Sequence, residues 1–177
     1  MNLVFFDLET QKLFRDVGGR NPGKLLLACA VTYSSAKSDF TIYWEADVKR
    51  LVDELRSADK VVGFNIREFD YEVLRPYQPA FNFAMLPTLD LFLDIRRLLN
   101  FGISLDSIAK ATLGSAKTAD GIQSVEWFQT GERDKVAQYC KEDVEITRKI
   151  YEFGREYGFV HYFSKLGSKL KIAVNWR

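Results

Sequence analysis

The sequence holds only two cysteines and no long apolar run, and each shortage argues against a class of protein. It also holds a single histidine. Cys29 and Cys140 lie far apart and no C-x-x-C pair occurs, so we expect neither a disulfide framework nor a cysteine zinc site, and a reducing compartment fits this use of cysteine. The longest apolar runs, such as LLLACAV, fall short of the roughly 20 residues that span a bilayer. No basic leader precedes the first acid. We therefore expect a soluble, cytoplasmic protein with no membrane partner.

The overall composition is that of an ordinary globular domain. Of the 177 residues, 47% are hydrophobic and 28% are charged, which allows a sizeable core. The net charge is only +1, so a nucleic-acid partner would have to be held by local contacts rather than by a global positive field. No repeat, low-complexity tract or linker divides the chain. We expect one domain over residues 1–177, with 159–177 as a C-terminal hairpin extension.

Hydrophobic periodicity predicts an α/β chain with a mixed sheet. Continuous apolar, β-prone runs predict strands at 3–6, 25–33, 40–44, 60–64 and 86–91. Amphipathic spacing and capping residues predict helices at 48–55, 93–99, 104–113, 122–128 and 132–153, and another helix that has Asp70 at its head and ends at about Leu74. The short link at 34–38 indicates a hairpin between the second and third strands. After Gly158 the apolar period becomes two, which predicts a terminal hairpin around Gly167-Ser168.

The long helix near the C-terminus places a carboxylate beside its buried stripe. Apolar positions recur at steps of three and four and form that stripe: Val136, Cys140, Val144, Thr147 and Tyr151. Tyr139 and Asp143 are four residues apart, so they share the adjoining face. A carboxylate there costs free energy unless a cation or hydrogen-bond donors satisfy it. In isolation, the pattern favours a capped or salt-bridged Asp143 at the edge of the stripe.

The first strand runs directly into a second pair of acids, Asp7 and Glu9. Because side chains alternate along a strand, both project from one face while Leu8 points to the other. Two neighbouring carboxylates repel each other, and a divalent cation between them relieves the repulsion. The alternative is a strand that simply emerges into solvent.

A third acid, Asp70, follows a buried strand at the head of a helix in the stretch GFNIREFD. Alone, it would only complement the helix dipole, an effect of roughly 0.3–1 kcal/mol. Together, Asp7, Glu9, Asp70 and Asp143 offer four hard oxygen ligands with no His or Cys in the set. Such a set suits Mg²⁺ or Mn²⁺ rather than zinc.

The ordered motifs FDLET, GFNIREFD and YCKED resemble those of the DEDD 3′–5′ exonucleases, also called the DnaQ-like superfamily. The resemblance spans about residues 3–153 and implies the ribonuclease H-like fold, a mixed central sheet flanked by helices. Some members carry a His five residues before the last Asp and others a Tyr four before it. Position 138 is Gln and position 139 is Tyr, so the chain resembles the tyrosine branch (DEDDy), and its opening is similar to YprB-like exonuclease domains.

The resemblance implies a two-metal phosphodiesterase acting at the 3′ end of single-stranded nucleic acid and releasing nucleoside 5′-monophosphates. We expect DNA in preference to RNA, although no residue of the sequence plainly recognises or rejects the 2′-hydroxyl. Two Mg²⁺ or Mn²⁺ ions would be bound by the four acids, and Tyr139 would orient the attacking water because its free pKa near 10 makes it a poor base. The residues expected to meet the substrate are Leu8, Thr10, Asn65 and Phe69. A turn role for Asn65 and a core role for Phe69 stay open.

Other readings also stay open. The fold could serve a non-catalytic nucleic-acid-binding or adaptor module, although a pure binder has no use for carboxylates facing phosphates. It could serve an endonuclease of the same fold, although the D-x-E pair on the first strand favours an exonuclease. A helicase or polymerase partner fits the resemblance. The only histidine, His161, matches no motif. The terminal hairpin also matches none, and Lys165, Lys169 and Lys171 within it could contact phosphates or simply face solvent.

Overall fold

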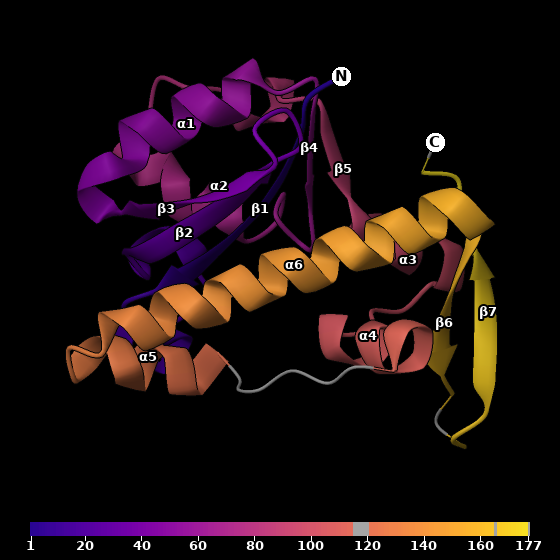
Figure 1. Cartoon of the computed structure of the whole chain (residues 1–177). Helices are drawn as coiled ribbons and strands as arrows, with labels where there is room; N and C mark the ends of the chain where they lie inside the picture. Colours follow the sequence, from indigo (N-terminus) through magenta and orange to yellow (C-terminus); the bar gives the residue numbers. More distant parts are fainter. Residues whose placement is uncertain (115–120, 165, 177) are drawn as a thin grey trace.

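A five-stranded mixed sheet forms the centre of the molecule (Figure 1), in a computed structural model that describes residues 1–114, 121–164 and 166–176. The strand order is β3-β2-β1-β4-β5. The antiparallel strands are β1 (Leu3–Thr10), β2 (Leu27–Ser34) and β3 (Asp39–Trp44), and β4 (Lys60–Gly63) and β5 (Thr88–Asp90) continue parallel to β1. The predicted mixed sheet and the hairpin between the second and third strands are confirmed.

Helices cover both faces of the sheet and divide the core into two layers. On one face lie α1 (Val48–Ser57) and α2 (Asp70–Leu74), and on the other lie α3 (Leu91–Leu99), α4 (Leu105–Leu113) and α6 (Arg133–Tyr157). Alternate side chains of β1 pack into both layers, because Phe5 joins the α6 layer while Val4 and Phe6 join the α1 layer. The helix α5 (Gly121–Gln129) packs against the start of α6 (Figure 1).

Among the described residues, no helix combines the length and apolar character needed to cross a bilayer. Five short 3-10 helices complete the connections in this part of the chain. Their bounds are η1 (Phe14–Val17), η2 (Pro22–Lys24), η3 (Glu45–Asp47), η4 (Arg75–Tyr77) and η5 (Phe83–Met85).

Several element boundaries differ from those predicted. The first strand does not end at Phe6 but runs to Thr10, because β2 supplies backbone partners as far as the pairs Asp7↔Val31 and Glu9↔Cys29. Both acids are therefore part of the sheet. The second strand starts later than predicted, at Leu27, because Leu26 adopts a left-handed conformation with φ of 60°.

The predicted helix with Asp70 at its head is confirmed, since α2 begins at Asp70, and the residues between β4 and α2 are not helical. Asn65 has a positive φ of 67°, and the carboxylate of Asp90 accepts hydrogen bonds from the backbone N–H groups of Asn65 (2.8 Å) and Arg67 (3.0 Å). Asp90 also caps α3 by accepting from Leu93 N–H at 3.2 Å, so that helix begins earlier than predicted and β5 is short.

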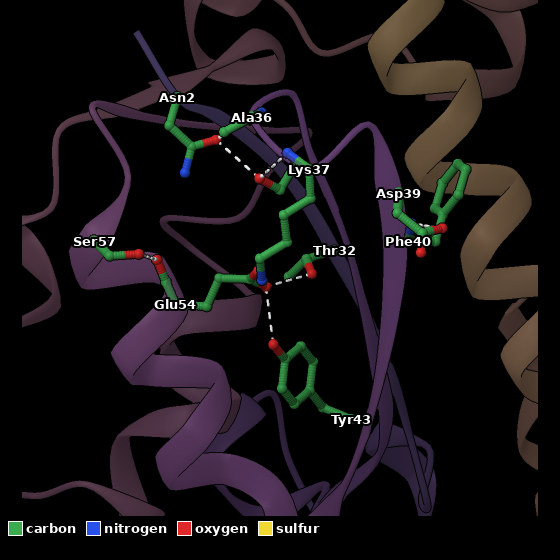
Figure 2. Close-up of polar contacts among 10 residues, drawn as sticks. Asn2, Thr32, Ala36, Lys37, Asp39, Phe40, Tyr43, Glu54 and Ser57 are labelled. Atoms are coloured by element: carbon green, nitrogen blue, oxygen red, sulfur yellow. Dashed lines mark hydrogen bonds and ion pairs between the residues drawn. The ribbon is translucent and has the colours of Figure 1, made fainter.

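A buried polar network ties α1 to the sheet on the layer away from α6 (Figure 2). Glu54 of α1 accepts hydrogen bonds from Thr32 Oγ1 (2.5 Å) and Tyr43 OH (3.0 Å), and from the ammonium of Lys37 (2.7 Å). Because these three groups donate to the carboxylate, the buried charge of Glu54 is satisfied.

The terminal hairpin forms a sheet of its own and does not extend the central one. Its strands are β6 (Phe159–Phe163) and β7 (Lys169–Ala173). It is held by Trp176, which is 1% exposed, stacks on Tyr151 and donates from Nε1 to Asp94 at 2.8 Å. The ring lies against Gly154 of α6, where an added Cβ would come within 2.3 Å of it. Only glycine leaves room for the tryptophan.

Candidate active site

The acids Asp7 and Glu9 occupy the side of β1 that faces α6. Glu9 is only 8% exposed, which excludes the alternative that this carboxyl simply emerges into solvent. The thiol of Cys140 donates to the main-chain oxygen of Asp7 at 3.3 Å and so joins α6 to the strand. The ligand atoms of Asp7, Glu9 and Cys140 all lie within 4.8 Å of one another. The first motif and the long helix therefore meet at one point.

The third acid is attached to the same strand from the opposite layer. Asp70 is the first residue of α2 and is 3% exposed. Its Oδ1 accepts a hydrogen bond from the backbone N–H of Leu8 at 3.1 Å, which fixes the carboxyl beside β1. Because Leu8 lies between Asp7 and Glu9, this bond brings the second motif to the first.

Tyr139 and Asp143 lie on α6 as the helical spacing predicted. Each is 5% exposed, and all five residues of the predicted apolar stripe are buried. The ring of Trp127 on α5 meets that of Tyr139 edge-on, with centroids 6.4 Å apart. The helix α5 therefore supports Tyr139 from the side, a contact that restricts the orientation of the phenol.

Burial and repulsion shift two of the acids, Glu9 and Asp70, toward their protonated forms. The pKa of Glu9 is raised well above its usual range by burial first and by the nearby Asp7 charge second, while the hydroxyl of Ser124 opposes the shift. The pKa of Asp70 is raised by burial, then by Asp7 and then by Asp90. Such a cluster binds either protons or cations at neutral pH.

All nine residues predicted for the site line a single cavity of about 500 Å³. They are Asp7, Leu8, Glu9, Thr10, Asn65, Phe69, Asp70, Tyr139 and Asp143. Leu8 takes part through its backbone, because its side chain is packed into the other layer of the core. The structure thus brings together residues from both ends of the sequence. His161 lies on β6 and is not part of this lining.

The cavity has further walls that the sequence did not indicate. Its remaining lining residues are Lys12, Leu13, Phe14, Leu25, Phe64, Gly121 and Ile122. Phe14 meets Phe69 edge-on with centroids 6.1 Å apart, so the two rings form one aromatic wall. The cavity lining therefore combines this aromatic wall with the carboxylates.

Two further residues near the site, Ser124 and Asp90, were also missed. Ser124 is fully buried on α5 and faces Glu9, and its only signal in the sequence is a polar residue on the inner face of a short helix. Asp90 holds the loop that carries Asn65, through the hydrogen bond described above. The sequence shows Asp90 near the end of a predicted strand, but it does not indicate that the carboxylate accepts hydrogen bonds from Asn65 and Arg67.

The match to a family model decides where the chain belongs. The RNase_H superfamily model matches residues 4–153. The chain belongs to the RNase_H superfamily. Its predicted ribonuclease H-like fold is thereby confirmed, with the hairpin as an addition beyond the matched residues. Among curated proteins, none matches the sequence significantly.

Solved structures with this RNase_H-like fold include two DNA enzymes. The family B DNA polymerase of the archaeon Pyrobaculum calidifontis matches with a TM-score of 0.67 and 15% identity, over 87% of this chain and 24% of the polymerase. A zinc-bound complex of E. coli ExoI with single-stranded DNA matches with a TM-score of 0.56 and 14% identity, over 88% of this chain and 41% of ExoI. At these identities the likeness concerns the fold, and the chain spans less than half of either protein.

Proposed function

We propose that this RNase_H-superfamily chain is a metal-dependent 3′–5′ exonuclease of the DEDDy type. The observation that carries the proposal is the convergence of four carboxylates and Tyr139, drawn from both ends of the chain, on one cavity. The proposed substrate is single-stranded nucleic acid, DNA in preference to RNA, and the proposed products are nucleoside 5′-monophosphates. Residues 1–177 would act as a single domain.

The donor set fits hard divalent cations. Asp7, Glu9, Asp70 and Asp143 would together hold two Mg²⁺ or Mn²⁺ ions, and the pKa values of Glu9 and Asp70, raised by burial first and by the Asp7 charge second, fit a site where cations would offset the cost of ionisation. Bound there, the two ions would activate a water molecule and stabilise the leaving oxygen. The backbone N–H of Leu8 and the thiol of Cys140 keep two of the carboxyl-bearing residues in place before any ion binds.

The proposed role of Tyr139 is to orient the attacking water. A phenol with an ordinary pKa near 10 is protonated at neutral pH, so its hydroxyl can hold water by a hydrogen bond but cannot serve as a general base. Its position one helical turn before Asp143 places it beside a proposed metal ligand. The ring contact with Trp127 supports this arrangement.

The proposed substrate contacts include the aromatic wall of the cavity. The paired rings of Phe69 and Phe14 offer a surface for the terminal base or sugar. The side-chain oxygen of Asn65 is buried and has no hydrogen-bond partner among the described residues. A buried acceptor without a donor is costly unless a ligand supplies one, which supports a substrate role for Asn65 in addition to the turn conformation that its φ of 67° shows. The Thr10 hydroxyl, which donates to Lys12 O at 2.9 Å, would meet the terminal sugar.

The test uses a single-stranded oligonucleotide labelled at its 5′ end, incubated with Mg²⁺ or Mn²⁺. We expect a ladder that shortens from the 3′ end, and a loss of rate of more than about 10²-fold in Asp7→Asn and Asp143→Asn. Asp134→Asn, which changes an exposed acid of the same helix, is the matched control and should cleave normally. Tyr139→Phe should lower kcat while leaving KM unchanged.

Other results would assign other functions. Internal cuts would indicate an endonuclease, and binding of DNA or RNA without cleavage in either metal would indicate an adaptor module. Either outcome would refute the exonuclease proposal. A helicase or polymerase partner and a cytoplasmic location stay predictions.

A further inference from the structure

The C-terminal segment carries a charge pattern unlike the rest of the chain. Residues 158–177 contain four of the 25 Lys and Arg residues and none of the 24 Asp and Glu residues. The remaining 157 residues therefore hold an excess of acids, although the whole chain has a net charge of +1. A local block of one sign marks a surface suited to an oppositely charged partner. Lys165 and Arg177 belong to this block but lie outside the described residues, so the structure describes two of its four cations, Lys169 and Lys171.

The terminal hairpin has one buried face and one solvent face. Val160 and its cross-strand partner Ile172 are buried against the α6 layer of the core. The opposite face, which we call the outer hairpin face, carries Phe159, His161 and Phe163 on β6 and Lys169, Lys171 and Ala173 on β7. On this face the pairs His161↔Lys171 and Phe163↔Lys169 set rings directly opposite cations. The period-two pattern thus places all of these rings and ammonium groups together.

Rings from the end of α6 extend the outer hairpin face. Phe153 meets Tyr157, Phe159 and His161 with centroids 4.6, 5.6 and 6.4 Å apart, which makes a continuous aromatic cluster. The ammonium of Lys171 lies 3.9 Å from the centre of the Phe159 ring. Helix and hairpin therefore build one surface of rings edged by positive charge.

This surface is open to solvent. Tyr157 is 54% exposed and Phe163 is 44% exposed, values high for large aromatic side chains. The pKa of His161 is lowered by partial burial and then by the charges of Lys169 and Lys171, a sign that the local potential is positive. Two acids of this end of α6 already have partners, because Glu152 is paired with Arg148 at 3.0 Å and Glu156 interacts with Tyr157.

We propose that the outer hairpin face is a second binding surface for single-stranded nucleic acid, which holds the strand upstream of the cleaved end. Exposed rings stack on bases of any sequence, at about 1–3 kcal/mol per base, and flanking lysines contact the phosphates. The role in cleavage rests on the proposed exonuclease function, whereas the binding itself does not. The same combination of rings and cations does not favour a neutral protein partner or a second copy of this positively charged face.

The position of this face sets the length of strand that can reach it. From Asp143 to Gly158, α6 advances by about 22 Å at 1.5 Å per residue. At the 3.4 Å spacing of stacked nucleotides, a strand must extend roughly six nucleotides beyond the cavity to touch the hairpin. A tetranucleotide can fill the active site without reaching this face, and a 20-nucleotide strand can occupy both.

The experiment measures binding without cleavage. The anisotropy of fluorescein-labelled oligothymidylates of 4 and 20 nucleotides is recorded in EDTA at several salt concentrations. In the variant Lys169→Gln/Lys171→Gln we expect affinity for the 20-nucleotide strand to fall at least fivefold at low salt. The slope of log K against log salt should shrink by about 1.4, since each lost phosphate contact on a single strand is worth about 0.7. Phe163→Ala should weaken binding and leave the slope unchanged.

The matched control removes two charges from the opposite layer of the molecule. Lys49→Gln/Arg56→Gln alters exposed cations of α1 and should bind the 20-nucleotide strand like the native protein. Equal losses in both double variants, an unchanged salt slope in the hairpin variant, or absence of binding by the native protein would each overturn the proposal. A dimer that Phe163→Ala dissociates would also overturn it, by assigning the face to a second copy. Loss of cleavage with hairpin binding intact would refute only the exonuclease function.

Discussion

Removing the charge of Glu9 should stabilise the metal-free protein while it abolishes catalysis. The carboxylate oxygens of Asp7 and Glu9 lie within 4.8 Å of each other. At an effective dielectric constant near 20, two unit charges at that distance repel by about 3.5 kcal/mol. In the native protein, proton uptake by Glu9 already relieves part of this repulsion. In the variant, the cost of burying the glutamine amide cancels part of the stability gained. We therefore expect Glu9→Gln to raise the free energy of unfolding by about 1–2 kcal/mol at pH 8 in EDTA.

The assay is thermal unfolding, because that gain corresponds to a Tm increase of about 2–8 °C for a domain of this size. Asp53→Asn is the control, since its side chain is 58% exposed and its substitution should change stability by less than about 0.5 kcal/mol. Mg²⁺ or Mn²⁺ should stabilise the native protein more than Glu9→Gln, because the ions take over the role of the bound proton.

The pH dependence has a definite sign. Between the ordinary pKa of 4.5 and the raised pKa of folded Glu9, the folded state binds more protons than the unfolded state. Stability of the metal-free native protein should therefore fall as the pH rises through that window. Glu9→Gln should flatten this decline. A variant that is no more stable than the native protein at pH 8, or that declines equally with pH, would refute the reasoning.

Two further substitutions test the packing that holds the site and the hairpin. Glu54→Gln should destabilise the fold by about 1–3 kcal/mol in urea unfolding, because Thr32 and Tyr43 lose a charged acceptor. Burial opposes ionisation of Glu54, but its hydrogen-bond donors lower its pKa below 4.5. In the native protein this stabilisation should therefore disappear as the pH falls through the lowered pKa. If Glu54→Gln lost stability at acidic pH as steeply as the native protein does, this prediction would be wrong. Gly154→Ala should cost about 1–3 kcal/mol and shift tryptophan fluorescence, since its Cβ would meet Trp176 within 2.3 Å. An alanine variant with native stability and fluorescence would contradict the packing argument.

Much of the site followed from the sequence because short-range rules determine it. Strand alternation put Asp7 and Glu9 on one face, and helical spacing put Tyr139 beside Asp143. The order of the three motifs then indicated a fold in which these elements meet. The cavity lined by all nine predicted residues agrees with that expectation. Which of them bind metal or substrate stays a prediction.

The missed features depend on contacts between distant elements. The apolar run that predicted the first strand ends at Phe6, whereas pairing with β2 and the Leu8 N–H bond to Asp70 keep Asp7 and Glu9 inside the sheet. Ser124 became notable only once α5 was placed against Glu9. A local pattern does not reveal which side chain will lie opposite another.

Most features of the hairpin were likewise beyond local rules. Its strands were predicted by their period of two, but its docking depends on Trp176 fitting against Gly154, which are 22 positions apart. No periodicity connects these two residues. The hairpin therefore became a separate two-stranded sheet for reasons of packing rather than of strand propensity.

The most direct measurement is anomalous diffraction from crystals of the protein soaked in Mn²⁺ with a short single-stranded oligonucleotide. We expect two manganese peaks roughly 3.5–4 Å apart, at ions that are bound by Asp7, Glu9, Asp70 and Asp143, with the 3′-terminal phosphodiester beside them. Peaks elsewhere in the molecule, or none among these four carboxylates at saturating Mn²⁺, would contradict the claim that the acids form one shared metal centre.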